Sequence, residues 1–478
     1  MDFSAFYPVF RFFFFRFYSI LPIFQASVVS FLSLNILIRR WMLPLRLPGV
    51  SAACRFSVIS DTFLILWIVR KITAFYTKAC LKTKHRHPLF QVLFGIQQKN
   101  GVFLCSDRRT RGTDKQSGGG HNAAASALKE SLNFYHHEAE VLDLMSLGRK
   151  HTSALVGGAY VKLVSVFPAG FGALYQLGEL VRKFPWKSPV YYANARLGNA
   201  LADYIDQNHF NAVVTTHLYP AETLTWMKQK GRLTIPCVAV ATDYACIPFW
   251  EETNCDYYVV PHKDLIPEFA SCGIPEEKLL PLGIPVRPAF ARPASKEDVR
   301  RHLGLPENAP LFLVMSGSMG FGKVHLLAHE LVSRLENGEQ AVIICGNNKK
   351  RMRSLRLQFH KNPNVHIIGF TRHVAEYMAA ADVLFTKPGG LSSTEAAVRR
   401  VPLVHTDPIP GCETKNRAFF VSRGMSVTGA HQKELAEAGI SLAHDGARQI
   451  AMRDAQRKNS HPQAGTSITH LLEKLVSE

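Results

Sequence analysis

Residues 385–416 read FTKPGGLSSTEAAVRRVPLVHTDPIPGCETKN and contain a strand end, a glycine turn, a helix and a second polar loop. The apolar residues that enter this stretch predict a buried strand, which ends at Pro388 and two glycines. Ser392 and Ser393 then predict the N-cap of a helix that runs to about Arg400. Such a helix start presents free N–H groups and partial positive charge to a phosphate or a pair of sugar hydroxyls. An ordinary strand–loop–helix unit with a capping serine explains the stretch equally well.

A second glycine cluster follows the apolar run at residues 309–318, APLFLVMSGS. Strand, glycine loop and helix form the geometry in which backbone N–H groups bind phosphate. The loop almost matches G-x-x-x-x-G-K-[ST], the signature of nucleoside triphosphatases. Val324, however, stands where the magnesium-binding hydroxyl belongs, and the glycine order does not fit G-x-G-x-x-G. The sequence therefore disfavours a P-loop hydrolase and does not support a dinucleotide site.

Two further apolar runs in this half end in small or polar residues. Residues 341–345 (AVIIC) lead into Gly346 and Asn347, and residues 365–368 (VHII) lead into a glycine and Phe370. A parallel sheet binds its ligand beyond the carboxyl ends of its strands. The alternation of strands and helices therefore predicts a doubly wound parallel sheet with its ligand at this edge.

The motifs SGSMGFGK, CGNN, IIGF, AADVLFTKPGGLSSTEA and PIPGCETKN resemble the monogalactosyldiacylglycerol synthase and processive diacylglycerol glucosyltransferase family. That family is related to the bacterial enzyme that adds N-acetylglucosamine to lipid I. The resemblance covers roughly residues 116–440. It implies the α/β GT-B fold, with two Rossmann-like doubly wound domains around a cleft. It also implies hexose transfer from UDP-glucose or UDP-galactose to diacylglycerol, with no metal ion or other cofactor.

Composition and the family resemblance together predict four parts of the chain. Residues 1–100 are an apolar, basic N-terminal segment, and the resemblance implies that residues 101–280 are an acceptor- and membrane-binding domain. Residues 281–296, PLGIPVRPAFARPASK, form a proline-rich linker, and residues 297–478 form the UDP-sugar-binding domain. Within the last part we expect a final helix at residues 466–476 that packs back across the domains, as in the GT-B fold.

Most of the formal net charge of +19 lies near the N-terminus, since residues 1–112 carry +13 and the remaining 366 residues carry +6. Aromatic and apolar residues separate these cations, which favours an anionic membrane surface over nucleic acid. Residues 17–38 contain no charge and are long enough to span a bilayer. A membrane anchor and translated upstream sequence explain residues 1–100 equally well. The nine cysteines match no zinc pattern and indicate a reducing compartment, so we expect the cytoplasmic face of the cell membrane.

The family resemblance also implies catalytic residues. The histidine of its GGGH motif, here His121, is the candidate base that takes the proton from the acceptor hydroxyl, and a near-neutral pKa suits that task. Asp243, at a predicted strand end, is the second candidate and assists the base. Here about ten polar residues precede the glycine loop, whereas in the family a strand runs directly into it. A role for His121 in only capping or orienting the loop therefore stays open.

For the donor, the resemblance implies that Glu395 binds the ribose hydroxyls, Phe370 lies against the uracil, and Glu413 and Asn416 contact the sugar. Helix dipoles and Lys387 would stabilise the departing UDP. Cys412 stands where the family often has glutamine, which leaves the donor sugar open. The predicted UDP-sugar site consists of Gly317, Ser318, Met319, Gly320, Gly346, Asn347, Phe370, Lys387, Gly389, Gly390, Ser392, Glu395, Glu413 and Asn416.

Residues 165–189, SVFPAGFGALYQLGELVRKFPWKSP, place basic residues beside Trp and Phe. This combination suits the headgroup layer of an anionic membrane, although a core helix with a solvated basic end explains it equally well. The predicted acceptor and membrane contacts are Gly119, Gly120, Phe171, Arg182, Lys183 and Trp186. Two alternative functions stay open at this stage: a UDP-N-acetylglucosamine transferase that acts on another lipid, and a non-catalytic membrane-associated nucleotide-sugar binder.

Overall fold

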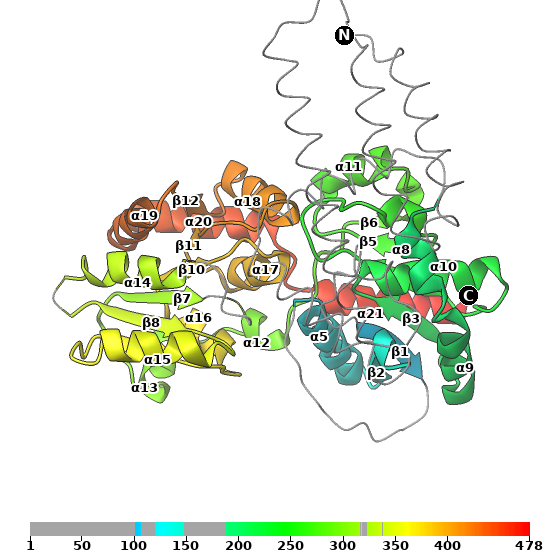
Figure 1. Cartoon of the computed structure of the whole chain (residues 1–478), viewed down its shortest axis with the longest axis horizontal. Coiled ribbons are helices and arrows are strands. Elements are labelled where there is room, and N and C mark those ends of the chain that lie inside the picture. Colours follow the sequence, from blue (N-terminus) through cyan, green and yellow to red (C-terminus); the bar gives the residue numbers. More distant parts are fainter. Residues whose placement is uncertain (1–100, 107–119, 148–186, 316, 318–322, 337) are drawn as a thin grey trace, which may run out of the picture. The chain divides into compact units, whose positions relative to one another are not determined.

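A computed structural model describes residues 101–106, 120–147, 187–315, 317, 323–336 and 338–478 (Figure 1). The chain divides into two compact units, Met1–His87 and Pro88–Glu478, and every described residue belongs to the second. Within this described part, no helix is both long and apolar enough to cross a bilayer. The predicted anchor and the apolar run at residues 17–38 lie outside the described residues.

The first six-stranded sheet has the order β2-β1-β3-β4-β5-β6. Strands β3 to β6 are parallel, and β3 and β4 are buried along their whole length, as expected for strands covered on both faces. The strands are β1 (Gly101–Ser106), β2 (Glu138–Asp143), β3 (Ala212–Thr215), β4 (Cys237–Val240), β5 (Tyr257–Val259) and β6 (Leu279–Leu280).

The first strand departs from the predicted parallel order. Strand β1 is present where it was expected, but it pairs antiparallel with both β2 and β3. Because β1 opposes both of its neighbours, β2 runs in the same direction as β3 to β6, and β1 is the reversed strand of this described sheet. The expectation of a purely parallel sheet is therefore wrong at β1.

Helix α5 (Gly120–Phe134) has a face of small residues, and Ala124, Ala125 and Leu128 on it are fully buried. The predicted last helix is present as α21 (Ala464–Ser477), and it packs against α5 and the first sheet. The remaining helices of this part are α8 (Pro189–Ala195), α9 (Gly198–Asn208), α10 (Leu218–Gln229) and α11 (Ile266–Ser271), with 3-10 turns η3 (Leu144–Leu147), η4 (Trp250–Glu252), η5 (Lys263–Leu265) and η6 (Glu276–Lys278).

The second sheet is parallel throughout and has the order β12-β11-β10-β7-β8-β9. Strands β7, β8 and β9 follow one another toward one edge of the sheet, and strands β10, β11 and β12 follow one another toward the other edge. The strand order therefore reverses between the neighbours β7 and β10. The loops that leave two such strands diverge and open a crevice at their carboxyl ends, the usual ligand position in this fold. The strands are β7 (Leu311–Met315), β8 (Gln340–Ile344), β9 (Val365–Ile368), β10 (Val383–Thr386), β11 (Leu403–His405) and β12 (Val427–Thr428).

Helices cover both faces of this sheet (Figure 1). The helices of this half are α12 (Pro288–Ala291), which contacts α17 and α5, and α13 (Lys296–His302), α14 (Val324–Val332), α15 (Lys349–Gln358), α16 (Val374–Ala380), α17 (Gly390–Arg399), α18 (Cys412–Ser422), α19 (Gln432–His444) and α20 (Gly446–Asn459). The side chains between the layers form a continuous hydrophobic core, in which the rings of Phe312 and Phe385 lie 6.5 Å apart. This core holds β7 and β10 side by side beneath the crevice.

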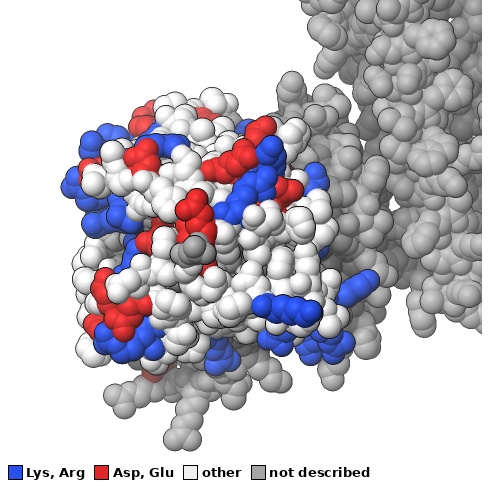
Figure 2. Space-filling view, turned by 90° about the vertical axis from the view of Figure 1, so that its left-hand side faces the viewer, with Lys and Arg blue, Asp and Glu red and all other residues white. Residues whose placement is uncertain are grey.

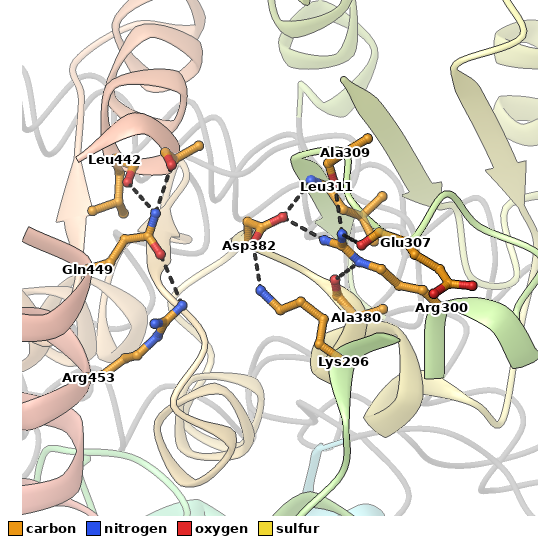
Figure 3. A network of polar contacts seen from close by, with 11 residues as sticks. Lys296, Arg300, Glu307, Ala309, Leu311, Ala380, Asp382, Leu442, Gln449 and Arg453 are labelled. Atoms are coloured by element: carbon orange, nitrogen blue, oxygen red, sulfur yellow. Dashed lines mark hydrogen bonds and ion pairs between the residues drawn. The ribbon is translucent and has the colours of Figure 1, made fainter. Parts of the chain in front are cut away.

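A polar network fastens α13 to the opposite, amino edge of the sheet (Figure 3). Asp382, just before β10, accepts from Lys296 at 2.5 Å, from Arg300 at 2.6 Å and from the Leu311 amide at 2.8 Å. The Arg300 guanidinium is 3% exposed and also donates to the carbonyls of Glu307, Ala309 and Ala380. These cations and hydrogen bonds hold the pKa of Asp382 below its usual value despite its partial burial.

Candidate functional site

The two predicted glycine clusters meet at the point where the strand order reverses. Gly317 follows β7, and Lys387, Gly389 and Gly390 follow its neighbour β10. Gly317 has a φ of +69°, and a β-carbon placed on it would lie 3.8 Å from Cε of Lys387. Residues 318, 319 and 320 of the predicted loop lie outside the described part of the chain. The sequence expectation that both turns line one crevice therefore agrees with the strand topology.

Helix α17 starts earlier than expected, and its serines do not cap it. The N-cap is Gly389, with extended backbone, and the first helical residue is Gly390. Ser392 lies inside the helix, and the hydroxyl of Ser393 bonds Nε2 of the buried His405 at 2.9 Å. The predicted serine N-cap is therefore wrong. Because no side chain caps this start, its first N–H groups are available to an anion above the crevice.

Gly390 also lies against the first sheet. A β-carbon on Gly390 would lie 1.9 Å from the carbonyl oxygen of Thr242, which follows β4. No side chain fits at that distance, so the start of α17 and the end of β4 touch through their backbones. This glycine is needed for the close approach of two backbones rather than for an unusual φ angle.

Gly390→Ala is expected to lower any sugar transfer at least about tenfold, because the methyl group forces the helix start away from Thr242 by more than a bond length. Gly446→Ala is the matched control, since a β-carbon there meets nothing within 4 Å. Steady-state transfer assays on both variants check the expectation. Equal activity of the two variants would show that this contact has no bearing on the site.

Glu395 lies on α17, one turn beyond its start, and is 9% exposed. Burial raises the pKa of this carboxyl to about 7, and the charge of Arg287 opposes the rise. Among the described residues, no hydrogen bond reaches the Glu395 carboxylate. A buried carboxylate without donors is costly, and two hydroxyls of a ligand would supply the missing donors. The position and environment of Glu395 therefore suit the predicted contact with a ribose.

This environment predicts pH-dependent donor binding. The raised pKa means that Glu395 is largely protonated at pH 6 and ionised at pH 8, and only the carboxylate accepts two hydroxyl donors. We expect the affinity for UDP-glucose, whose phosphates do not titrate in this range, to rise about tenfold between these pH values. Calorimetric titration would measure it. Glu395→Gln should bind weakly with no such rise, and a flat wild-type profile would contradict the prediction.

Lys387 and Glu413, both predicted donor contacts, bind each other. Nζ of Lys387 donates to Oε1 of Glu413 at 2.8 Å, and Oε2 of Glu413 accepts from the Ile409 amide at 2.7 Å. Both side chains are largely buried. The pair fixes the ammonium group close to Gly317 and near the start of α17.

Asn416 links the two sheets. Its carbonyl accepts from the Tyr244 amide at 2.7 Å, and its amide donates to Asp243 at 2.8 Å and to the Pro388 carbonyl at 3.0 Å. Asn416 is fully buried, so in this structure its polar atoms bind the loops after β4 and β10. Asp243 and Asn416, predicted for different roles, are thus direct neighbours. The contact of Asn416 with a sugar stays a prediction.

Tyr244 was not among the site residues predicted from the sequence. This buried tyrosine lies 2.9 Å from Oγ1 of Thr394 on α17, and its ring packs against Phe419 and Phe420 on α18. Burial raises the pKa of Tyr244 to about 12, so the hydroxyl stays protonated. Because Thr394 donates to the Gly390 carbonyl, Tyr244 donates to Thr394. The signal in the sequence that could have indicated a site role for Tyr244 was its position directly after Asp243, at a strand end.

The other predicted residues fall into two groups. Gly346 and Asn347 follow β8, and Phe370 follows β9 with 54% of its surface exposed, so all three lie at the carboxyl edge of the second sheet. Gly120 and His121 are the first two residues of α5, which packs against α17. Five predicted acceptor and membrane residues lie outside the described part of the chain: Gly119, Phe171, Arg182, Lys183 and Trp186.

The described chain resumes at Lys187, within the predicted membrane segment of residues 165–189. Nζ of Lys187 donates to the carbonyl of Glu252, and the amide and hydroxyl of Ser188 donate to its two carboxylate oxygens at 2.6 and 2.7 Å. Glu252 therefore anchors the end of this segment to the first domain.

Within the described residues, no cluster of three or more His, Cys, Asp and Glu could hold a metal ion.

Each of the two halves is similar to a known protein family. Residues 121–286 match the family described as monogalactosyldiacylglycerol (MGDG) synthase, and residues 295–460 match glycosyl transferases group 1. The resemblance predicted from the motifs is thereby confirmed, as is the GT-B type of fold with two Rossmann-like domains.

Among curated proteins, this chain is similar to two staphylococcal enzymes named processive diacylglycerol beta-glucosyltransferase. The one from Staphylococcus carnosus is 32% identical over 228 residues, which cover 48% of this chain and 58% of that protein. The one from Staphylococcus saprophyticus is 34% identical over 207 residues, which cover 43% of this chain and 53% of that protein. The chain thus spans little more than half the length of these relatives.

Among solved structures, Acinetobacter baumannii MurG is similar with 17% identity and a TM-score of 0.45, covering 59% of this chain and 79% of that one.

Proposed function

We propose that this protein transfers a hexose from a UDP-sugar to diacylglycerol at the surface of a membrane. The observation that carries the proposal is Glu395, a buried carboxyl without a described donor, one turn beyond an uncapped helix start at the crevice of the second sheet. This arrangement provides one acceptor for a ribose and N–H donors for a diphosphate. The names of the curated relatives supply the acceptor, diacylglycerol.

The proposed reaction is a single displacement. His121 takes the proton from the diacylglycerol hydroxyl, and the oxygen forms a bond to the anomeric carbon of the sugar. The bond between that carbon and the diphosphate oxygen breaks, and UDP leaves with the electron pair. Asp243 assists the base, and Asn416 holds its carboxylate in place at 2.8 Å.

Charge on the departing UDP is stabilised in this scheme by protein groups. The start of α17 presents N–H groups and partial positive charge, and Lys387 adds an ammonium group held by Glu413. We therefore propose that the reaction needs no metal ion. We place it at the cytoplasmic face of the cell membrane, where the predicted membrane segment of residues 165–189 would reach an anionic lipid surface.

The test is transfer of radiolabel to diacylglycerol in anionic liposomes by the full chain, with EDTA present. UDP-glucose, UDP-galactose and UDP-N-acetylglucosamine are compared as donors. Lipid-linked label from a hexose donor that survives chelation supports the proposal. Label only from UDP-N-acetylglucosamine would overturn the assigned donor class. No label from any donor, although UDP binds, would indicate a nucleotide-sugar binder without transferase activity.

A further inference from the structure

One exposed face of the second domain carries charge of a single sign. Residues 340–375 contain seven Lys and Arg and no Asp or Glu, whereas residues 113–478 as a whole carry only +6. This stretch therefore accounts for the entire basic surplus of residues 113–478. In Figure 2, Lys and Arg groups at the lower right of the view have no acidic group beside them.

Helix α15 directs these cations outward. Leu355 is its one buried residue, and at 100° per residue the opposite side of the helix carries Arg353 and Leu357. Leu357 is 76% exposed. We define the α15 face as the exposed residues Lys349, Lys350, Arg353, Leu357 and Lys361.

The cations of the α15 face are not neutralised by the protein. The structure gives Lys349, Lys350, Arg353 and Lys361 no ion pair or hydrogen bond to another side chain among the described residues. Three exposed cations elsewhere in this domain are paired: Arg301 with Asp298 and Glu307, Arg457 with Asp454, and Lys433 with Glu437. An exposed leucine among unpaired cations suits the boundary of an anionic lipid layer, where cations bind headgroups and the apolar side chain enters beneath them.

We propose that the α15 face is a second membrane contact, which docks the donor domain on an anionic bilayer independently of the N-terminal segment. The choice of a bilayer over another polyanion rests on the proposed function, because a transferase acting on diacylglycerol works at a lipid surface. The predicted membrane segment of residues 165–189 belongs to the first domain and the α15 face to the second, so two contacts would hold both domains on the membrane that supplies the acceptor.

The test uses the full chain with the photo-crosslinking residue p-benzoylphenylalanine in place of Leu357. The matched control carries it in place of Ile450, which is 62% exposed on α20 of the same domain. Vesicles of phosphatidylglycerol and phosphatidylcholine are compared with vesicles of phosphatidylcholine alone. We expect lipid crosslinks at position 357 to exceed those at position 450 about tenfold, and only on anionic vesicles. This readout reports the site itself, so binding through the N-terminal segment cannot hide the result.

A charge variant completes the test. Each cation near an anionic surface contributes roughly fivefold in binding, so Lys350→Gln, Arg353→Gln and Lys361→Gln together should lower crosslinking at position 357 by tenfold or more. The control with Arg301→Gln, Lys433→Gln and Arg457→Gln changes net charge equally and should not. Equal crosslinking at both positions, an unchanged yield in the first triple variant, or an equal loss in both variants would overturn the proposal. Crosslinking needs no sugar transfer, so its failure is distinguishable from failure of the proposed reaction.

Discussion

His121→Ala is expected to lower transfer of sugar to diacylglycerol at least about a hundredfold, the lower end of the usual contribution of a general base. The acceptor hydroxyl is a weak nucleophile until its proton is removed, and histidine exchanges protons near neutral pH. His121 lies at the start of α5, which packs against the helix that begins the donor crevice. UDP affinity should not change, because the predicted nucleotide contacts lie on the second sheet.

Radiolabel transfer by the full chain measures this effect, with UDP binding by calorimetry as the parallel readout. His431→Ala is the control, because His431 is exposed and makes no side-chain cap bond at α19. A variant that keeps more than a tenth of the wild-type rate would reduce His121 to a residue that orients the glycine loop. Loss of UDP binding together with transfer would instead indicate damage to the fold.

The second sheet was predictable because each strand is a short apolar run that ends in glycine or a polar residue. Strand β9, Val365–Ile368, has the predicted bounds, and strands β7 and β8 differ from theirs by one to three residues at each end. Periodicity and turn residues are local signals, so sequence alone carries them. The position of Gly317 beside Lys387 depends in addition on the pairing of β7 with β10, which these local signals do not specify.

The remaining features depend on partners distant in sequence. Ser392 and Ser393 look like caps, but the approach of Gly390 to Thr242 fixes an earlier helix start. The hydrogen bonds of Asn416 to Asp243 and Tyr244 join residues more than 170 positions apart, and no local pattern encodes them. Strand β1 shows the same limit. Its position was readable, whereas its direction depends on pairing with β2 and β3.

Arg300→Met is expected to lower the free energy of unfolding of the second domain by about 3 kcal/mol. Removing one member of a buried ion pair leaves its partner's charge and the bonded backbone groups without compensation. Here the variant leaves Asp382 with Lys296 and the Leu311 amide, and it frees the carbonyls that Arg300 holds at 2.7 to 2.9 Å. Methionine fills much of the same volume, so the loss reports the polar network rather than a cavity.

Arg301→Met is the matched control, one residue away on the same helix. Its guanidinium pairs with Asp298 and Glu307 at the surface, with 63% of the side chain exposed, so its loss should cost less than about 1 kcal/mol. Urea unfolding followed by hydrogen exchange of the β7 amides isolates the second domain, because two domains need not unfold together. Equal destabilisation by the two variants would contradict the prediction.

The pH dependence of the free energy of unfolding shows whether Arg300 stabilises the domain through its charge or through packing alone. The pKa of Asp382 is lowered in the folded protein, so its contribution to stability is present above the unfolded pKa and is lost as pH falls through the folded value. Wild-type protein should therefore lose stability below about pH 4, near the unperturbed value for aspartate. In Arg300→Met that loss should be smaller, because one cation that lowers the pKa of Asp382 is gone. An identical slope in both proteins would mean that Arg300 stabilises the domain through its carbonyl contacts and not through its charge.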